Sequence, residues 1–307
     1  MKIKKILIMI SLLLVMILSG CTKTEKVDIY TTVYPLEYVA KEIVKETKVV
    51  KSVYPRGAEV HDYEPYPKEI IAMCNSDVLF YIGLGLEPFI SNALDTTFKD
   101  LDTVRVTENV QLLEIGGTST KEDDNHNGVY DTHVWLDPIA MIQITDCILQ
   151  KLNEIYPELT ETFTTNAEVL KEKLEALNQQ FVEALADETI LNKTIMVDHD
   201  AYAYWSSRYG ISRIKLRGDN ESNEVTPSML IEKVNQAREL GIEYIIATKN
   251  ETESALFDQY LKNLGAKREE LHHLGTITTD ELKTGKNYIT IMEDNLQVLI
   301  KVLPRKK

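Results

Sequence analysis

Short apolar runs alternate with longer amphipathic stretches along most of this 307-residue chain. Apolar runs bounded by turn residues predict strands, and apolar positions three and four apart predict helices. In the first half, strands are predicted at 27–33, 48–54, 77–83 and 103–108, with helices at 36–47, 66–75 and 86–98. In the second half, strands are predicted at 194–200, 213–218, 244–249 and 270–275, separated by helical stretches. This alternation is typical of βαβ units with parallel strands.

One long segment between the halves contains no glycine, and no proline after Pro157. Its apolar residues recur at spacings of three and four, namely Leu159, Phe163, Ala167, Leu170, Leu174, Leu177, Phe181 and Leu185. A helix of roughly thirty residues would be about 40 Å long, the diameter of a small domain or more. A coiled-coil arm is the alternative, but the segment is short of charge-paired heptads. We therefore interpret it as a strut between two lobes.

The predicted fold class is α/β, with two βα lobes of mainly parallel sheets joined by one long helix, and a cleft between the lobes. We divide the chain into a signal peptide at 1–20, a lipidated tether at 21–26, an N-terminal lobe at 27–157, a linking helix at 158–188 and a C-terminal lobe at 189–307.

The first twenty residues have the pattern of a signal peptide. Lys2, Lys4 and Lys5 precede an apolar run at 6–18, and small residues then lead to Cys21. The run is shorter than the ~20 apolar residues that span a bilayer, so cleavage is favoured over a membrane anchor. The ending "LSGC" resembles the bacterial lipoprotein signal, which implies that Cys21 is the first mature residue and carries a lipid on the outer face of the membrane.

The composition is acidic, with a formal charge of −14. Nucleic acid is excluded as a partner, because phosphate binding needs clustered Lys and Arg. An acidic surface suits a carrier of cations and also serves solubility. Apart from Cys21, only Cys74 and Cys147 are present, and they make no disulfide framework. Both are expected to be buried small hydrophobic residues.

Three of the six histidines follow predicted strands. His61 lies past the second strand, His133 lies between the last strand of the first half and a helix starting near Pro138, and His199 ends the first strand of the second half. Ligands of open α/β sheets bind at the carboxyl ends of strands, so the three side chains can converge in one crevice. Three neutral imidazoles suit zinc better than calcium or magnesium. No close-spaced zinc motif is present, and a histidine with such spacing, taken alone, is more often a hydrogen-bonded loop residue than a ligand.

Several segments in order resemble one protein family. "VYPLEYVAKEI", "GAEVHDYEPYPKEI", "DVLFYIGLGLEPFI", "DTHVWLDP", "HDAYAYWSSRYGI" and "GKNYITIMEDNLQVL" look like the solute-binding lipoproteins of bacterial zinc and manganese ABC importers. The resemblance runs from about Val27 to Leu303 and implies two βα lobes joined by one long helix. It also implies that His61, His133 and His199 are metal ligands. Manganese-type members tend to carry glutamate at the third position, so His199 points to zinc.

The stretch "DTHVWLDP" also predicts the surroundings of His133. Trp135 is expected to pack beneath His133, and the helix is expected to begin at Pro138 with Asp137 as its cap.

The fourth zinc position stays open. Relatives often place a carboxylate at the slot that corresponds here to Gly275 or Thr276, neither of which supplies a usual zinc donor. Water, Asp280 and Glu59 are the remaining candidates, in that order. His272 and His273 are adjacent, so in a strand they would point to opposite faces and at most one could face the cleft.

The acidic loop at 121–131 has the opening spacing of a calcium-binding EF-hand, but Val134 stands where that motif needs its bidentate glutamate. It instead resembles a short form of the His-rich loop of many zinc members, with His126 as its single histidine. A solvated turn is an equal alternative.

We therefore expect an extracytoplasmic, monomeric zinc-binding protein, lipid-anchored at Cys21, that delivers Zn²⁺ to an ABC permease and is not an enzyme. No phosphate-binding Gly-Lys-Ser/Thr loop occurs in the chain, so the transport ATPase and the permease must be other chains. The alternatives are a surface adhesin or matrix binder on the same scaffold and, less favoured, a three-histidine zinc hydrolase.

Overall fold

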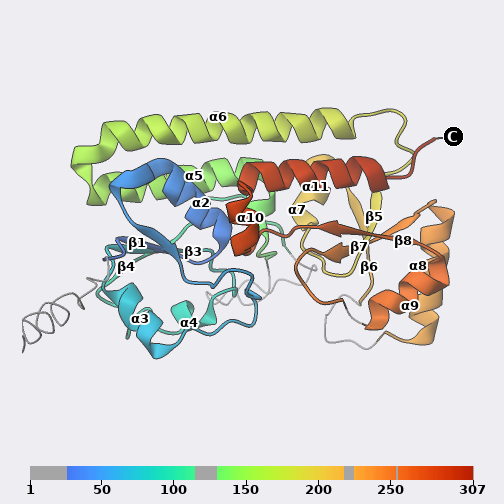
Figure 1. The fold of residues 1–307 in the computed structure, drawn as a ribbon, viewed down its shortest axis with the longest axis horizontal. Helices are drawn as coiled ribbons and strands as arrows, with labels where there is room; N and C mark the ends of the chain where they lie inside the picture. Colours follow the sequence, from blue (N-terminus) through green and yellow to red (C-terminus); the bar gives the residue numbers. More distant parts are fainter. Residues whose placement is uncertain (1–25, 115–129, 218–224, 254, 307) are drawn as a thin grey trace, which may run out of the picture.

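The computed structural model describes residues 26–114, 130–217, 225–253 and 255–306. Two lobes lie side by side, and one long helix, α6 (Thr160–Leu185), runs along both of them (Figure 1). Each lobe holds a four-stranded sheet in which neighbouring strands are parallel. The predicted fold class is thereby confirmed.

The sheet of the N-terminal lobe has the order β2-β1-β3-β4. Its strands are β1 (Ile29–Thr31), β2 (Val50–Ser52), β3 (Val78–Tyr81) and β4 (Asp102–Arg105). The helices of this lobe are α2 (Tyr34–Val44), α3 (Pro67–Cys74), α4 (Pro88–Ser91) and α5 (Pro138–Ile155), with single 3-10 turns η1 (Lys45–Thr47), η2 (Val134–Leu136) and η3 (Pro157–Leu159).

The sheet of the C-terminal lobe repeats this arrangement with the order β6-β5-β7-β8. Its strands are β5 (Thr194–Val197), β6 (Ser212–Lys215), β7 (Tyr244–Thr248) and β8 (Lys267–Leu271). Its helices are α7 (Ala203–Tyr209), α8 (Pro227–Glu239), α9 (Ala255–Leu264), α10 (Thr279–Lys283) and α11 (Tyr288–Val302).

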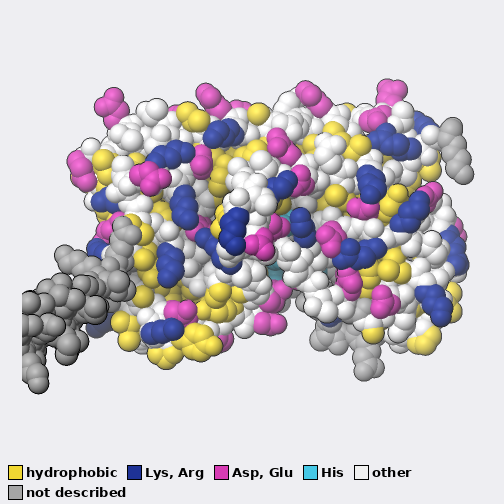
Figure 2. Space-filling view, in the orientation of Figure 1, with side chains coloured by type: hydrophobic (Ala, Val, Ile, Leu, Met, Phe, Trp, Pro, Cys, Tyr) yellow, Lys and Arg dark blue, Asp and Glu magenta, His cyan; other side chains and the backbone are white. Residues whose placement is uncertain are grey.

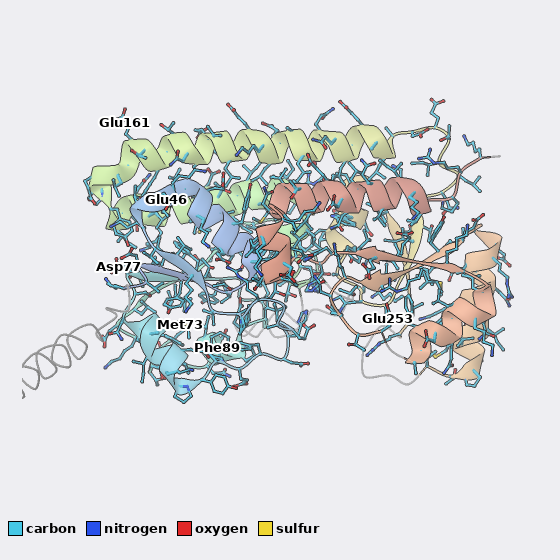
Figure 3. The ribbon with its side chains drawn as sticks, viewed as in Figure 1. Glu46, Met73, Asp77, Phe89, Glu161 and Glu253 are labelled. Carbon is cyan, nitrogen blue, oxygen red and sulfur yellow. The ribbon has the colours of Figure 1, made fainter. Side chains whose placement is uncertain are left out.

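Helix α6 packs on both lobes instead of extending into solvent. It contacts α2 and α5 of the N-terminal lobe and α7 and α11 of the C-terminal lobe. Its apolar stripe is fully buried, as the spacing predicts, from Phe163 at 0% exposure to Leu185 at 1%. The opposite face is polar, and Glu161 in the first turn projects outward (Figure 3). One hydrophobic core continues from lobe to lobe beneath this helix, so the strut interpretation describes it better than a coiled-coil arm.

Three expectations need correction. The helix predicted at 86–98 ends at Ser91, after which the chain continues in turns through Asp95, Thr96 and Thr97, whose side chains disfavour a helix interior. Cys74 is exposed, because it is the last residue of the short helix α3 and lies on its outer side, although it is free of a disulfide as expected. Strand β8 ends at Leu271, so the histidine pair that follows lies in a loop.

Within the described residues, no helix is both long and apolar enough to cross a membrane.

Candidate metal centre

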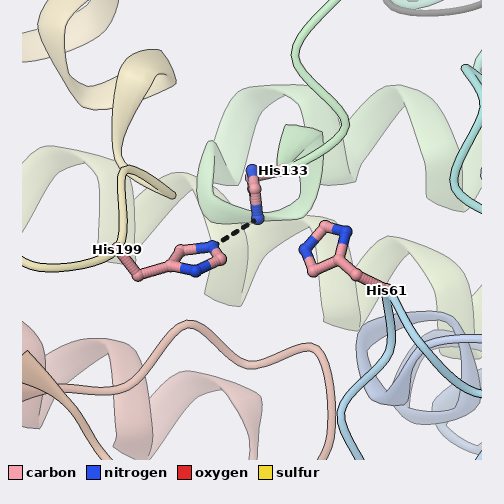
Figure 4. A group of neighbouring side chains, drawn as sticks. All are labelled: His61, His133 and His199. Carbon is pink, nitrogen blue, oxygen red and sulfur yellow. Dashed lines mark hydrogen bonds between the residues drawn. The ribbon is translucent and has the colours of Figure 1, made fainter. Parts of the chain in front are cut away.

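The structure brings together the three histidines that follow predicted strands. His61 comes from the connection between β2 and α3, His133 from the loop before α5, and His199 from the residues just after β5. One nitrogen from each ring can be chosen so that all three lie within 4.8 Å of one another (Figure 4). In the space-filling view, histidine is visible at the middle of the molecule, at the boundary between the lobes (Figure 2).

The three rings have the mutual spacing of imidazoles around one ion. Their centroids are 5.2 Å apart for His133 and His199, 5.3 Å for His61 and His133, and 5.7 Å for His61 and His199. Two imidazoles bound tetrahedrally at the usual Zn–N length would have centroids about 5 Å apart. Nε2 of His133 and Nε2 of His199 are 3.2 Å apart and face each other. The cluster is therefore close to a ligating geometry.

A buried carboxylate orients His133. Oδ1 of Asp131 lies 3.0 Å from Nδ1 of His133 and also accepts a hydrogen bond from the His133 backbone N–H at 2.8 Å. Burial opposes ionisation of Asp131, but the electrostatic interaction and the hydrogen bonds with His133 hold the pKa of that carboxyl below its usual range. An ionised carboxylate only accepts hydrogen bonds, so Nδ1 of His133 carries a proton and Nε2 presents a lone pair to the cluster.

The loop that carries His133 is locked by the start of α5. Asp137 caps this helix by accepting from the N–H of Ile139 at 3.0 Å, as expected for an Asp-Pro pair, and it also pairs with Arg208 at 2.7 Å. The ring of Trp135 meets the ring of His133 edge-on at 5.3 Å, which confirms the predicted packing. Contacts with Trp135 and Asp131 therefore fix the His133 ring, and only 8% of the residue is exposed.

Hydrogen bonds tie this loop to the C-terminal lobe. The indole Nε1 of Trp135 donates to the carbonyl of His273 at 2.7 Å, and the hydroxyl of Tyr288 donates to the carbonyl of Trp135 at 2.7 Å. Nε1 of Trp205 donates to the carbonyl of Leu136 at 2.8 Å. Residues of both lobes therefore fix the position of the central histidine.

The environment keeps two of the imidazoles neutral. Burial, followed by the nearby His133, lowers the pKa of His61 to about 4, although His61 retains an exposed edge. Burial and then the neighbouring histidines lower the pKa of His199 to about 2. Both rings are neutral at pH 7, which is the protonation state that binds metals.

The candidates for a fourth ligand differ in their placement. Asp280 is 90% exposed and pairs with Lys283 at the surface of α10, so its carboxylate is directed away from the cluster. Glu59 accepts a hydrogen bond from the His61 backbone N–H at 3.1 Å. The hydroxyl of Thr276 donates to the carbonyl of Ala58 at 3.1 Å.

A cavity of about 310 Å³ is lined by residues of both lobes that include Glu59, Glu251, His272 and His273. The sequence interpretation missed Asp131, which stands two residues before His133, and Glu251, which lies in the loop after β7. Asp131 could have been found from its place just before a histidine, and Glu251 from its place after the end of a strand. Cys21, His126 and residues 121–129 of the acidic loop lie outside the described residues.

Comparisons with known proteins agree with this architecture. The family described as zinc-uptake complex component A, periplasmic, matches residues 29–302. The chain is 30% identical over 305 residues to the zinc-binding lipoprotein AdcA of Streptococcus pneumoniae, which covers 96% of this chain and 60% of AdcA. It is 26% identical over 287 residues to the high-affinity zinc uptake system protein ZnuA of Bacillus subtilis, with coverage of 92% and 89%.

A solved structure is also similar. The crystal structure of the Zn(II)-bound ZnuA-like domain of Streptococcus pneumoniae AdcA matches with a TM-score of 0.74 at 29% identity, covering 91% of this chain and 99% of that domain. The chain thus spans about 60% of the length of full AdcA and corresponds to this one domain of it.

Proposed function

Because the chain belongs to the family of zinc-uptake complex component A proteins, we propose that it captures Zn²⁺ outside the cytoplasm and delivers it to the permease of an ABC importer. The observation that carries this proposal is the convergence of His61, His133 and His199, from both lobes, to within 4.8 Å of one another. These residues are the proposed ligands of the transported ion.

The donor set favours zinc over the other common divalent ions. Three neutral imidazoles form a nitrogen site of intermediate softness, whereas calcium, magnesium and manganese prefer carboxylate and carbonyl oxygen. His199 supplies nitrogen at the position where manganese-type relatives tend to have a carboxylate. The similarity to proteins whose names describe them as zinc-binding or as parts of zinc uptake supports the same choice.

Capture fits this geometry better than catalysis does. A catalytic zinc needs a general base or a shaped substrate cavity beside its bound water. Here the carboxylates of Asp131 and Glu251 are each paired with a histidine, at Nδ1 of His133 and at Nε2 of His273, so neither is free to act as a general base. The proposed role of the site is therefore to hold an ion and release it to a partner.

The proposed location is the outer face of the cell membrane, with a lipid on Cys21. The apolar run at 6–18 followed by "LSGC" supports this assignment. A tethered protein needs no membrane span of its own, and the permease and ATPase are separate chains.

Metal analysis of the purified protein, followed by competitive titration with Zn²⁺ and Mn²⁺, tests the proposal. We expect one zinc per chain and a clear preference for zinc over manganese. A zinc-loaded sample should be inert toward ester and carbon dioxide substrates. Turnover of such a substrate, or tighter binding of manganese, would contradict the transport role as stated.

A further inference from the structure

A fourth histidine lies against the three-histidine cluster. His273 is the second residue after β8, and only 5% of it is exposed. Its ring centroid is 6.0 Å from that of His199, with 37° between the planes. The end of β8 at Leu271 removes the alternation that would send neighbouring side chains to opposite faces, and the rings of His272 and His273 stack at 6.1 Å in the loop.

We infer that His273 supplies the fourth nitrogen ligand to the captured metal ion, and that Glu251 is the positioning residue that orients its ring. This inference rests on the proposed metal-binding function and completes its site. The result is a site of four imidazoles, in which three are grouped before binding and the fourth joins the ion.

The spacing of the rings places His273 a short movement away from ligation. Imidazole centroids around one tetrahedral zinc are separated by about 5 Å. The centroids of His133 and His199 are already 5.2 Å apart, and those of His199 and His273 are 6.0 Å apart. His273 therefore has to approach by about an ångström, which a side-chain rotation in a loop can supply.

The lack of a side chain at Gly275 leaves room for the His273 ring. A Cβ atom at Gly275 would lie 2.9 Å from Cε1 and 3.0 Å from Nδ1 of His273. Contacts this short do not occur between real side chains, so the His273 ring occupies the volume that a side chain at 275 would need. The absence of a side chain at 275 and the presence of histidine at 273 are thus coupled.

A carboxylate oxygen lies close to a ring nitrogen of His273, as it does for His133. Oε1 of Glu251 lies 3.2 Å from Nε2 of His273, and Oδ1 of Asp131 lies 3.0 Å from Nδ1 of His133. Histidines that bind metals usually donate their second ring N–H to a carboxylate, and Oε1 of Glu251 lies at the distance from which it could accept that N–H. A proton on Nε2 of His273 leaves the lone pair on Nδ1 for the metal.

The present orientation of the ring leaves Nδ1 weakly engaged. Nδ1 of His273 accepts from the N–H of Gly275 at 3.3 Å, longer than a typical N–H···N or N–H···O bond. Among the described residues, Oε1 of Glu251 is a buried atom without a hydrogen bond of good angle, despite its short distance to the ring. A rotation that turns Nδ1 toward the cluster therefore breaks only this one long hydrogen bond of the ring.

The backbone of His273 is held by a hydrogen bond from the N-terminal lobe. Its carbonyl accepts from Nε1 of Trp135, the residue that packs on His133. Asp280 is exposed at the surface, which leaves Glu59 and water as the competing donors.

The test counts imidazoles on the zinc ion by X-ray absorption and measures zinc affinity by competition, in the full chain. We expect four imidazoles in the wild type and three in His273→Ala, with an affinity lower by roughly tenfold or more. The adjacent His272→Ala is the matched control and should keep four imidazoles. Glu251→Gln should keep four imidazoles but weaken zinc binding, because the ring loses its charged partner.

A double variant tests the shared volume independently. Gly275→Asp alone should disturb the site, because its Cβ meets the His273 ring. His273→Ala combined with Gly275→Asp should recover zinc affinity relative to His273→Ala, with three imidazoles and one carboxylate bound. This recovery also shows that any loss in His273→Ala is not a folding defect.

The outcomes separate this inference from the proposed function. If the wild type binds no zinc, the proposed function fails and this inference fails with it. If the wild type binds zinc and His199→Ala loses it, but His273→Ala keeps the same imidazole count and affinity, only the fourth-ligand assignment is overturned.

Discussion

The carboxylate of Asp131 lies 3.0 Å from Nδ1 of His133, and Asp131, at 5% exposure, is even less accessible than His133, which is 8% exposed. We predict that Asp131→Ala lowers zinc affinity by about 10- to 100-fold, because His133 would lose both its fixed tautomer and its fixed orientation. Competition with a chelator of known affinity measures the change.

Circular dichroism and thermal unfolding of Asp131→Ala would show whether the loss reflects the site or the fold. Asp131→Asn retains an oxygen that can accept from His133, so we expect it to retain more affinity than the alanine variant. Equal affinities for wild type and Asp131→Ala would mean that the carboxylate plays no part in zinc binding.

Zinc affinity should depend on each of the three clustered histidines. We predict that alanine at His61, His133 or His199 reduces zinc affinity at least tenfold, or about 1.4 kcal/mol. Isothermal titration or chelator competition gives the values. Asp280→Ala is the control, because its exposed side chain pairs with Lys283 and should leave the affinity unchanged. An unchanged affinity in His199→Ala would contradict the ligand assignment.

The stability of the metal-free protein should depend on pH through His199. Its native pKa of about 2 lies below the unfolded value near ~6.5, so the unfolded chain takes up the proton first as pH falls below ~6.5. This term reduces stability at lower pH. Glu87 acts in the opposite direction between about 4.5 and 7, because burial raises its native pKa to about 7.

The comparison that isolates His199 is therefore wild type against His199→Asn, in which Glu87 is unchanged. The wild-type unfolding temperature, measured without metal, should fall more than that of the variant when the pH drops from 7 to 5. Parallel pH profiles for the two proteins would show that His199 is not held neutral by its surroundings.

The lipid anchor can be tested without metal. We predict that Cys21→Ala blocks lipidation, so that the protein leaves the membrane fraction or accumulates unprocessed. Fractionation followed by mass measurement distinguishes these forms from the wild type. A Cys21→Ala protein of mature size that remains in the membrane fraction would contradict the assignment, and Cys74→Ala is the matched control.

Closure on metal binding should be small. Helix α6 packs on helices of both lobes and lies over a core that continues between them, so a large hinge motion would have to break that core. Small-angle scattering curves of the metal-free and zinc-loaded protein should nearly superimpose, with slight tilting and local loop changes only. A large contraction on loading would show that the helix is not a rigid strut.

Periodicity predicted the elements of this fold because parallel strands and amphipathic helices leave strong signals. The buried stripe from Phe163 to Leu185 repeats at three and four residues, and the observed helix follows it. The helix after β3 was predicted too long, since the apolar residues past Ser91 pack from turns. Single residues of low helix preference decided that boundary.

The candidate site was partly predictable. His61, His133 and His199 could be singled out because strand ends converge in this class of fold. The roles of Glu251 and His273 could not, since they depend on where β8 stops and on which way a loop side chain turns. A strand longer by two residues would have separated His272 from His273 by the sheet, as the alternation rule requires.

Trp135 and Trp205 are the two tryptophans of the chain. The first packs on His133 and donates its indole N–H across the lobe boundary, while the second donates to the neighbouring Leu136 carbonyl. Indole emission responds to nearby charge and to hydrogen bonding. The protein thus contains a native optical reporter at its proposed metal centre, and the intensity and wavelength of its ultraviolet fluorescence are expected to follow occupancy in real time without a dye or a label.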